Sequence, residues 1–414
     1  MSELRDLLRI RDYRYFWTAQ VLSDFGDNLT FLTLLILIQR LTGSTVALAG
    51  LMIAITVPTL VFGTLAGVYV DRVDRKKAML VSDLLRGLVV LCFLFVQSPD
   101  MLPLIYLIAF VQASIGTVDN PARSAFLPAV VGSEKLLAAN SVSQTSRIVF
   151  NLLGTAAAGI LAATFDTLGP AFVLDSATFI ASFLLVSRIK TSGVSEKTAD
   201  SRVWVEMKEG FGVMASSRPL RAVIASLSVT MLGLGAVNVL FVPFLIDDLD
   251  VSEAFLGAIE ASQVVGLVVS GAVVAVLAAR LRPANLVSMG LVGVGTFVAA
   301  ISTTVAVWQV MVLLVFVGLS VGPVQAGANT LSQTLVEDSM RGRVGGAINT
   351  LLSAANVASM GLAGVAAAAI GTRNVFLLCG GLVLLSGLLA FWLMRDIRTA
   401  LTHEPAAEAM ADQG

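Results

Sequence analysis

The sequence is poor in charged side chains and in the residues that bind metals or form crosslinks. Only 13% of its 414 residues are charged, and it contains one histidine and two cysteines. The histidine, His403, lies near the C-terminus, which excludes a histidine-based metal site. Cys92 and Cys379 each fall inside a long apolar run, so we interpret them as small apolar residues rather than a disulfide or a metal pair. No glycine-rich phosphate loop of the Walker type is present, and no enzyme or cofactor is expected.

Long apolar runs dominate the sequence. Hydrophobic residues make up 57% of the chain, and the mean hydropathy is +0.88. Runs of the ~20 residues needed to cross a bilayer recur through the sequence. They lie near residues 14–39, 45–70, 78–97, 102–125, 136–164, 168–188, 221–246, 254–279, 284–304, 306–333, 344–370 and 374–394. We therefore expect an all-α polytopic membrane protein with twelve transmembrane helices and no cleavable signal peptide, because the polar, basic segment from Met1 to Arg14 leads directly into the first run.

The positive charges are distributed unevenly. Of the 27 lysines and arginines, only Arg40 and Arg373 fall in loops that an inside N-terminus places outside, and Arg147 lies within a span. The others lie in the termini, in loops on the inner side or near the inner ends of spans. By the positive-inside rule, both termini are expected in the cytoplasm and the protein in the inner (cell) membrane.

The runs divide into two halves of six. We expect an N-terminal six-helix bundle at residues 1–189 and a cytoplasmic linker at 190–218, whose part from Trp204 to Met214 is amphipathic. A C-terminal bundle at 219–396 and a cytoplasmic tail at 397–414 follow. Several identities recur between the halves at a nearly constant offset, among them Arg14, Gly26 and Gly50 with Arg221, Gly233 and Gly257. Such repeats predict two pseudo-symmetric bundles with a site between them.

Polar side chains inside the runs form stripes. Residues at spacings of three and four share one face of a helix, and in a membrane this face must line the bundle interior. The N-terminal stripes consist of Gln20, Asp24, Asp27 and Asn28, then Gln112, Gly116, Asp119, Asn120 and Arg123, then Asn140, Gln144, Arg147 and Asn151. The C-terminal half offers Asn238, Glu260, Gln263, Gln325, Asn329, Gln333, Asn349, Ser353 and Asn356. Charge is thus concentrated in the N-terminal half.

The carboxyl groups of the first run suggest a chemistry. Asp24 and Asp27 lie one turn apart with no cation in their central part of the run, and repulsion and poor solvation favour a protonated form. This predicts proton coupling or cation binding by the pair, with Glu260 as the C-terminal candidate. A structural role is the alternative.

Other buried charges have two interpretations. Asp119 and Arg123 are spaced to pair with each other or to act in gating. Arg147 requires an acidic partner, which Asp24, Asp27 or Asp119 can supply as a fixed ion pair. Asp175 is interpreted as a structural contact. The aromatic residues Phe31, Phe241 and Phe244 are candidates either for stacking on a substrate or for packing.

A charged loop separates the second and third runs. Gly67, Asp71, Arg72, Arg75 and Lys76 have the spacing Gly-x-x-x-Asp-Arg-x-x-Arg-Lys. This pattern resembles the loop between the second and third spans of the major facilitator superfamily. Further segments resemble the drug-efflux branch that includes macrolide and enterobactin exporters: Asp83-Leu-Leu-Arg86, Asn120-Pro-Ala-Arg123-Ser-Ala-Phe-Leu-Pro, Ala139-Asn140-Ser141 and Ala171-Phe-Val-Leu-Asp175.

The resemblance implies roles for these residues. It implies that the loop holds a cytoplasmic gate shut in the outward-facing state, with Asp71 against the positive N-terminal end of the eleventh span. We group Asp83 and Arg86 with this gate. The chain departs from the antiporter pattern in the fifth span, where the stretch from Gly154 to Gly159 lacks the proline of the usual Gly-Pro kink.

The sequence therefore predicts a proton antiporter that exports small amphiphilic or cationic organic compounds by alternating access, driven by the proton gradient. Expected partners are the small-molecule substrate, protons and the lipid bilayer, with no nucleic acid, and a monomer is expected. The alternatives are an exporter of one metabolite, such as a siderophore, and a non-transporting receptor or scaffold.

The loop generates a first prediction. Asp71→Asn removes a charge that only the outward-facing state satisfies, so the resting population should shift toward inward-facing. The measurement is labelling of a single cysteine at Asn329 from the cytoplasmic side, in a background lacking Cys92 and Cys379. Labelling at the parent rate after the substitution would contradict the role of this loop in holding the cytoplasmic gate shut.

Overall fold

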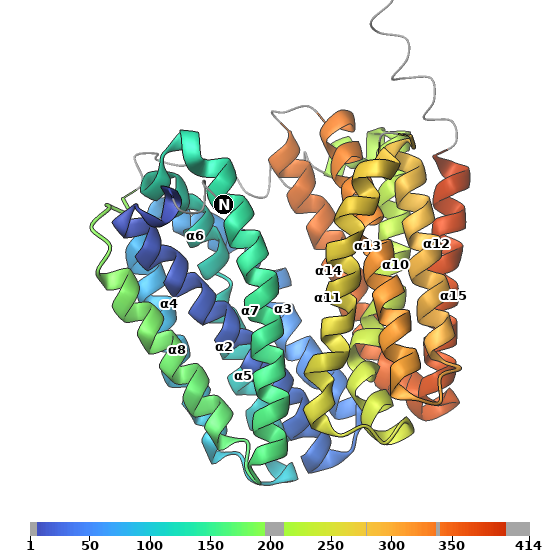
Figure 1. Cartoon of the computed structure of the whole chain (residues 1–414), viewed down its shortest axis with the longest axis horizontal. Helices are drawn as coiled ribbons and strands as arrows, with labels where there is room; N and C mark the ends of the chain where they lie inside the picture. Colours follow the sequence, from blue (N-terminus) through green and yellow to red (C-terminus); the bar gives the residue numbers. More distant parts are fainter. Residues whose placement is uncertain (1–5, 195–210, 279, 337–339, 395–414) are drawn as a thin grey trace, which may run out of the picture. The chain divides into compact units, whose positions relative to one another are not determined.

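The computed structural model describes residues 6–194, 211–278, 280–336 and 340–394. All the regular elements in these residues are helices, and twelve of them are long and apolar enough to cross a membrane (Figure 1). The expected fold class is thus confirmed. Residues 204–210 of the expected amphipathic segment and the tail at 397–414 lie outside the described ranges.

The N-terminal half contributes six spans. Three of them consist of consecutive helices, because α4 continues in a short 3-10 helix, the fourth span is divided into three helices, and a 3-10 helix leads into the fifth span. The elements are α2 (Arg11–Thr42), α3 (Thr45–Arg72), α4 (Arg75–Val90) with η1 (Leu91–Phe95), η2 (Pro99–Met101) with α5 (Leu102–Gly116) and α6 (Asp119–Val131), η3 (Ser133–Lys135) with α7 (Leu136–Thr164), and α8 (Gly169–Ser187).

The C-terminal half contributes the other six. They are α10 (Arg218–Pro243) with the π-helical turn η4 (Phe244–Asp248), η5 (Glu253–Phe255) with α11 (Leu256–Ala278), α12 (Pro283–Ile301), α13 (Val307–Leu335), α14 (Arg341–Ile370) and α15 (Thr372–Leu393).

Local sequence fixes several helix ends. The side chain of Ser44 caps α3 by accepting from the Ala47 amide, and Gly43 ends α2 in the left-handed conformation at φ 57°, which glycine adopts without a Cβ penalty. Asp74 caps α4 by accepting from the amides of Lys76 and Lys77. Two residues between α2 and α3, and two between α3 and α4, therefore suffice to reverse the chain.

The chain forms two compact units. Unit 1 comprises residues 1–203, 238–261 and 360–372, and unit 2 comprises 204–237, 262–359 and 373–414. Unit 1 thus holds the N-terminal spans together with the end of α10, the start of α11 and the end of α14. The compact units do not follow the boundary between the two halves of the sequence.

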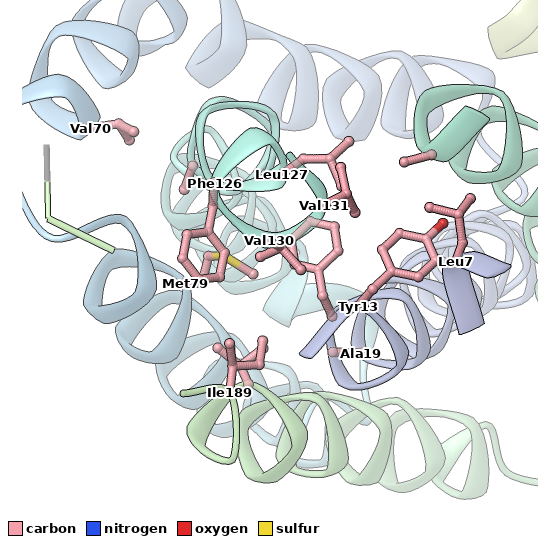
Figure 2. Close-up of a cluster of buried hydrophobic side chains, with 14 residues drawn as sticks. Leu7, Tyr13, Ala19, Val70, Met79, Phe126, Leu127, Val130, Val131 and Ile189 are labelled. Atoms are coloured by element: carbon pink, nitrogen blue, oxygen red, sulfur yellow. The ribbon is translucent and has the colours of Figure 1, made fainter. Parts of the chain in front are cut away.

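One end of unit 1 is closed by an apolar cluster. Figure 2 shows Met79 of α4 next to Phe126 of α6 with Val130 close by, and Tyr13 of α2 beside Leu7. The cluster takes buried side chains from α2, α3, α4, α6, α7 and α8 and includes Ile189 after α8. We call this the loop end, because the Arg72–Lys77 loop lies there, and the opposite end the far end.

In unit 2, glycines at the helix contacts allow neighbouring helices to pack closely. A Cβ added to Gly380 of α15 would lie 2.3 Å from the Ala299 amide nitrogen of α12, closer than real contacts allow. Gly387 makes a second close approach, with the Val292 nitrogen 2.6 Å from its added Cβ. In lipid, van der Waals packing at such small residues is a main driving force for helix association.

The neighbouring Gly381 provides a matched control, since its added Cβ meets no described atom within 4 Å. Gly380→Ala should lower the free energy of unfolding by about 1–3 kcal/mol through overpacking. Gly381→Ala should leave it unchanged or raise it by up to about 1 kcal/mol, because alanine has the higher helix propensity. Thermal unfolding of the purified protein in detergent measures both. Equal melting temperatures for the two variants would contradict the close packing of α12 and α15.

Candidate functional site

The fourth span is broken where its charges begin. Thr117 and Val118 form a turn between α5 and α6, and the Thr117 hydroxyl donates to the Ser114 carbonyl at 2.7 Å. Asp119 and Arg123 follow on α6, joined at 2.7 Å between Oδ2 and Nε, and their side chains are only 11% and 6% exposed. Of the two interpretations of this pair, the structure shows the ion pair.

The carboxyl groups of α2 also have cationic partners. Arg86 of α4 donates to Asp27, and Arg147 of α7 lies 3.9 Å from Asp24. Both carboxyl groups therefore have a cation nearby, and of the three partners considered for Arg147 the structure shows Asp24. Their cations come from other helices, α4 and α7, which the sequence of the first span alone does not reveal.

A polar seam joins α2 to α7. Asn28 donates to Asn151 at 2.7 Å, and Ser143 donates to Gln20 at 3.3 Å. Close packing makes these contacts possible, because a Cβ on Gly154 would lie 2.3 Å from the Phe25 carbonyl oxygen. The stripes expected on the first and fifth spans thus face each other.

Asp83 and Arg86 do not lie in the loop with which we grouped them. They are eight and eleven residues beyond Arg75, about 12 and 16 Å along α4, which carries them into the bundle. Asp83 is fully buried and accepts from Ser182 of α8 at 2.6 Å. The Arg86 guanidinium lies 4.4 Å from the centre of the Phe179 ring, beside the break at Gly116.

Two cavities border these charges within unit 1. One, of about 290 Å³, is lined by Asp27, Arg86 and mostly apolar side chains. Its other lining residues are Asn28, Thr30, Phe31, Leu34, Ile55, Phe93, Ala109, Gln112 and Ala113. The second, of about 350 Å³, lies nearer the loop end and is more polar, with Arg123 and Arg147 in its wall. The remaining residues that line it are Phe16, Gln20, Asn120, Ser124, Leu127, Asn140, Ser143 and Gln144.

The charged loop contacts the C-terminal end of α8. The Lys76 ammonium donates to the carbonyls of Ser187 and Ile189 at the C-terminal end of α8, where a cation is favoured. Arg72 is exposed, and the Asp71 side chain lies outside the described part of the structure. No described atom lies within 4 Å of a Cβ added to Gly67.

At the far end, unit 1 joins the two halves of the sequence. Arg40 donates to Glu253 at 2.5 Å and to the Ala162 carbonyl at 2.6 Å, and Gln39 donates to Asp247 at 2.8 Å. Glu260 of α11 contacts the Thr155 side chain of α7 and forms no ion pair with the described residues. These contacts between halves were not predicted, because no local pattern pairs Arg40 with a residue more than two hundred positions away.

The remaining predicted polar residues do not all join the network. Asn238 is exposed in unit 1, whereas Gln325, Asn329 and Asn356 belong to unit 2. Gln325 and Asn329 are exposed on α13, and Asn356 approaches the Met231 sulfur at 4.0 Å. Of the candidate aromatic residues, Phe31 lines the apolar cavity and Phe244 is fully buried.

Comparison with known proteins identifies the family. A family model described as transmembrane secretion effector matches residues 6–411. The chain belongs to this branch of the major facilitator superfamily. It is 25% identical to macrolide efflux protein A of Streptococcus pyogenes over 379 residues, covering 89% of this chain and 92% of the relative. It is 26% identical to the multidrug efflux pump Tap of Mycolicibacterium fortuitum, covering 94% and 97%.

Solved structures of the superfamily share the fold. A mutant of the nucleoside transporter NupG superposes with a TM-score of 0.77 at 10% identity, covering 92% of this chain and 98% of that one. A bacterial homologue of the iron transporter ferroportin gives a TM-score of 0.73 at 16% identity, covering 94% and 99%. The protein is thus a multi-pass cell-membrane transporter of the drug-efflux branch and not an enzyme.

The ion pairs of this transporter differ in burial, which allows a paired test. Arg123→Gln leaves Asp119 without its cation in a buried site, and the free energy of unfolding should fall by about 3–5 kcal/mol. Arg147→Gln removes a side chain that is 40% exposed and 3.9 Å from its partner, so the loss should be about 0–1 kcal/mol. Denaturation in detergent measures both. A larger loss of stability for Arg147→Gln than for Arg123→Gln would contradict the conclusion that Asp119–Arg123 is the more tightly paired and more deeply buried of the two ion pairs.

Proposed function

We propose that this transporter exports small amphiphilic or cationic organic compounds in exchange for protons, by alternating access. The observation that carries the proposal is the Asp27 carboxyl group, which lines the apolar cavity and is paired with Arg86. Its side chain is 38% exposed while that of Arg86 is 8% exposed, so Asp27 is the charged member of the pair that a ligand reaches.

The cavity fits an amphiphile with a positive charge. Phe31 and Phe93 offer aromatic surface, Asn28 and Gln112 offer amide groups, and Asp27 offers a negative charge. Aromatic faces attract organic cations, and a carboxylate in an apolar wall attracts them more strongly. Similarity to a macrolide efflux protein and to a multidrug efflux pump supports a substrate of this kind.

Competition for Asp27 gives a physical basis for antiport. A proton neutralises the carboxylate and removes its attraction for a cation, whereas a bound cation favours the ionised form. The two ligands therefore exclude each other at one residue, and the proton gradient supplies the energy with no cofactor. Glu260, which contacts Thr155 near the far end, remains the candidate for coupling in the C-terminal half of the sequence.

The orientation we propose places both termini in the cytoplasm. Asp12 near the start of α2 accepts from the amides of Lys190 and Thr191, so the chain start and the linker lie at the loop end with Lys76 and Lys77. This basic end is the inner side by the positive-inside rule. The far end, where Arg40 donates to Glu253, then faces outward.

A transporter of one acidic metabolite is the second candidate. The polar cavity supports it, because Arg123 and Arg147 stand in its wall together with several amide side chains. Susceptibility of a knockout and an overexpressing strain to a panel of cationic amphiphiles and of anionic compounds separates the two candidates. Protection confined to anionic compounds would favour the second. Family membership leaves the receptor or scaffold alternative without support.

The coupling role of Asp27 gives a direct prediction. Asp27→Asn is nearly isosteric with the protonated residue but exchanges no proton, so it should abolish uphill export driven by a pH gradient. The measurement is accumulation of a compound chosen from the panel, in proteoliposomes with an imposed pH gradient. Downhill movement of the compound should persist, which shows that the variant is folded.

The matched variant is Asp24→Asn on the same helix. Asp24 lies one turn nearer the loop end and does not line the apolar cavity, so uphill export should be reduced less. Full uphill export by both single variants and by the double variant would remove the first span from the coupling mechanism.

A further inference from the structure

Asp175 of α8 is a buried carboxyl group that the proposed mechanism has not used. Its residue is 0% exposed, and no lysine or arginine among the described residues lies within 4.0 Å of its oxygens. An ionised carboxylate in such a place is costly without a cation, whereas a protonated one needs only hydrogen bonds. The contacts of Asp175 meet this second requirement.

Two threonines supply those hydrogen bonds. The Thr30 hydroxyl of α2 donates to Asp175 Oδ2 at 2.5 Å. The Thr178 hydroxyl donates to the Asp175 carbonyl at 2.7 Å and reaches Oδ1 only at 3.3 Å. Oδ1 therefore has the weaker donor, and it is the oxygen that can carry a proton. It also lies against the α2 backbone, 2.1 Å from the position of a Cβ added to Gly26.

The charge balance of the N-terminal spans also supports a protonated Asp175. Their described interior holds five carboxyl groups, of Asp24, Asp27, Asp83, Asp119 and Asp175, and three guanidinium groups, of Arg86, Arg123 and Arg147. Each guanidinium pairs with one carboxylate, which leaves Asp83 and Asp175 with hydroxyl donors alone. Two carboxyl groups thus remain for protons.

Asp175 differs from Asp83 in its neighbours. The charged groups that act on it electrostatically are Asp27 of α2 and Arg86 of α4, and Arg86 is also acted on by Asp119 of α6 and Asp83 of α4. η1 contributes no charged side chain, and Arg147 of α7 contacts Asn120 and Asp24 instead. Arg86 also stacks on Phe179, one turn after Asp175 on α8. Thr30, which donates to Asp175, lines the same cavity as Asp27.

We propose that Asp175 is a second proton-binding residue of this transporter, coupled to Asp27 through Arg86. One proton and one guanidinium are distributed over two carboxyl groups: Arg86 pairs with the ionised group, and the proton occupies the other. In the exchange, the O–H bond of Asp175 breaks, a new O–H bond forms on Asp27, and the guanidinium moves from Asp27 to Asp175. The net charge of the site stays constant, so no uncompensated ion is left in the apolar interior.

Infrared difference spectroscopy of the purified protein tests this inference, which rests on the proposed proton coupling but is read out without transport. A protonated carboxyl group gives a carbonyl-stretch band that shifts in D₂O. We expect one such band to be lost in Asp175→Asn. It should also be lost in Asp27→Asn, because the released Arg86 then pairs with Asp175 and displaces its proton.

Matched variants separate coupling from a structural role. The Asp175 band should persist in Asp24→Asn and in Asp83→Asn, which leave the Asp27–Arg86 pair in place. Thr30→Val should move it to higher frequency by removing the hydrogen bond on Oδ2, and this variant is available if Asp175→Asn fails to fold. The inference is overturned if Asp175→Asn or Asp27→Asn retains the full band. Failure of pH-driven export in the parent protein, with the band pattern as expected, would overturn the antiport proposal alone.

Discussion

The structure of the N-terminal spans depends on how an apolar bundle accommodates more carboxyl groups than cations. A charge at the centre of a bilayer costs about 2.5–3.5 kcal/mol even on lenient insertion scales, so each must find a partner inside the protein. Arg86, Arg123 and Arg147 each neutralise one aspartate, and these pairs bind α4 to α2, α6 to itself and α7 to α2. The remaining carboxyl groups lie where only hydroxyl groups reach them, which favours their neutral form.

Helix packing brings these groups to their partners. Glycines at Gly26 and Gly154 allow α8 and α7 to approach α2 so closely that a side chain there would collide with Asp175 and with the Phe25 carbonyl. The break between α5 and α6 frees Gly116 to lie beside Arg86. A small apolar cavity then opens onto one ion pair, and that pair is the part of the network at which a ligand and a proton can compete.

Much of the fold was predictable because its signals are local. Hydropathy over ~20 residues defines the spans, and the spacing of Gln20, Asp24 and Asn28 defines the face of α2 that meets α7. Ion-pair partners were less predictable, since the relative heights of different helices decide them. Arg86 follows the charged loop closely in sequence, yet the rise of α4 carries it to Asp27. Asp175 was interpreted only as a structural contact, and no local pattern links it to its main donor, Thr30, which is 145 residues away.

The central claim is that a proton and a cationic substrate compete for Asp27. The most direct measurement is the number of protons released when a transported compound binds to the purified protein. Calorimetry in buffers of different ionisation enthalpy gives this number. The account predicts a net proton release from the molecules in which Asp27 carries the proton, and this release should disappear in Asp27→Asn, which binds the compound more weakly. Binding with no proton release by the parent protein, or with the same release by Asp27→Asn, would contradict it.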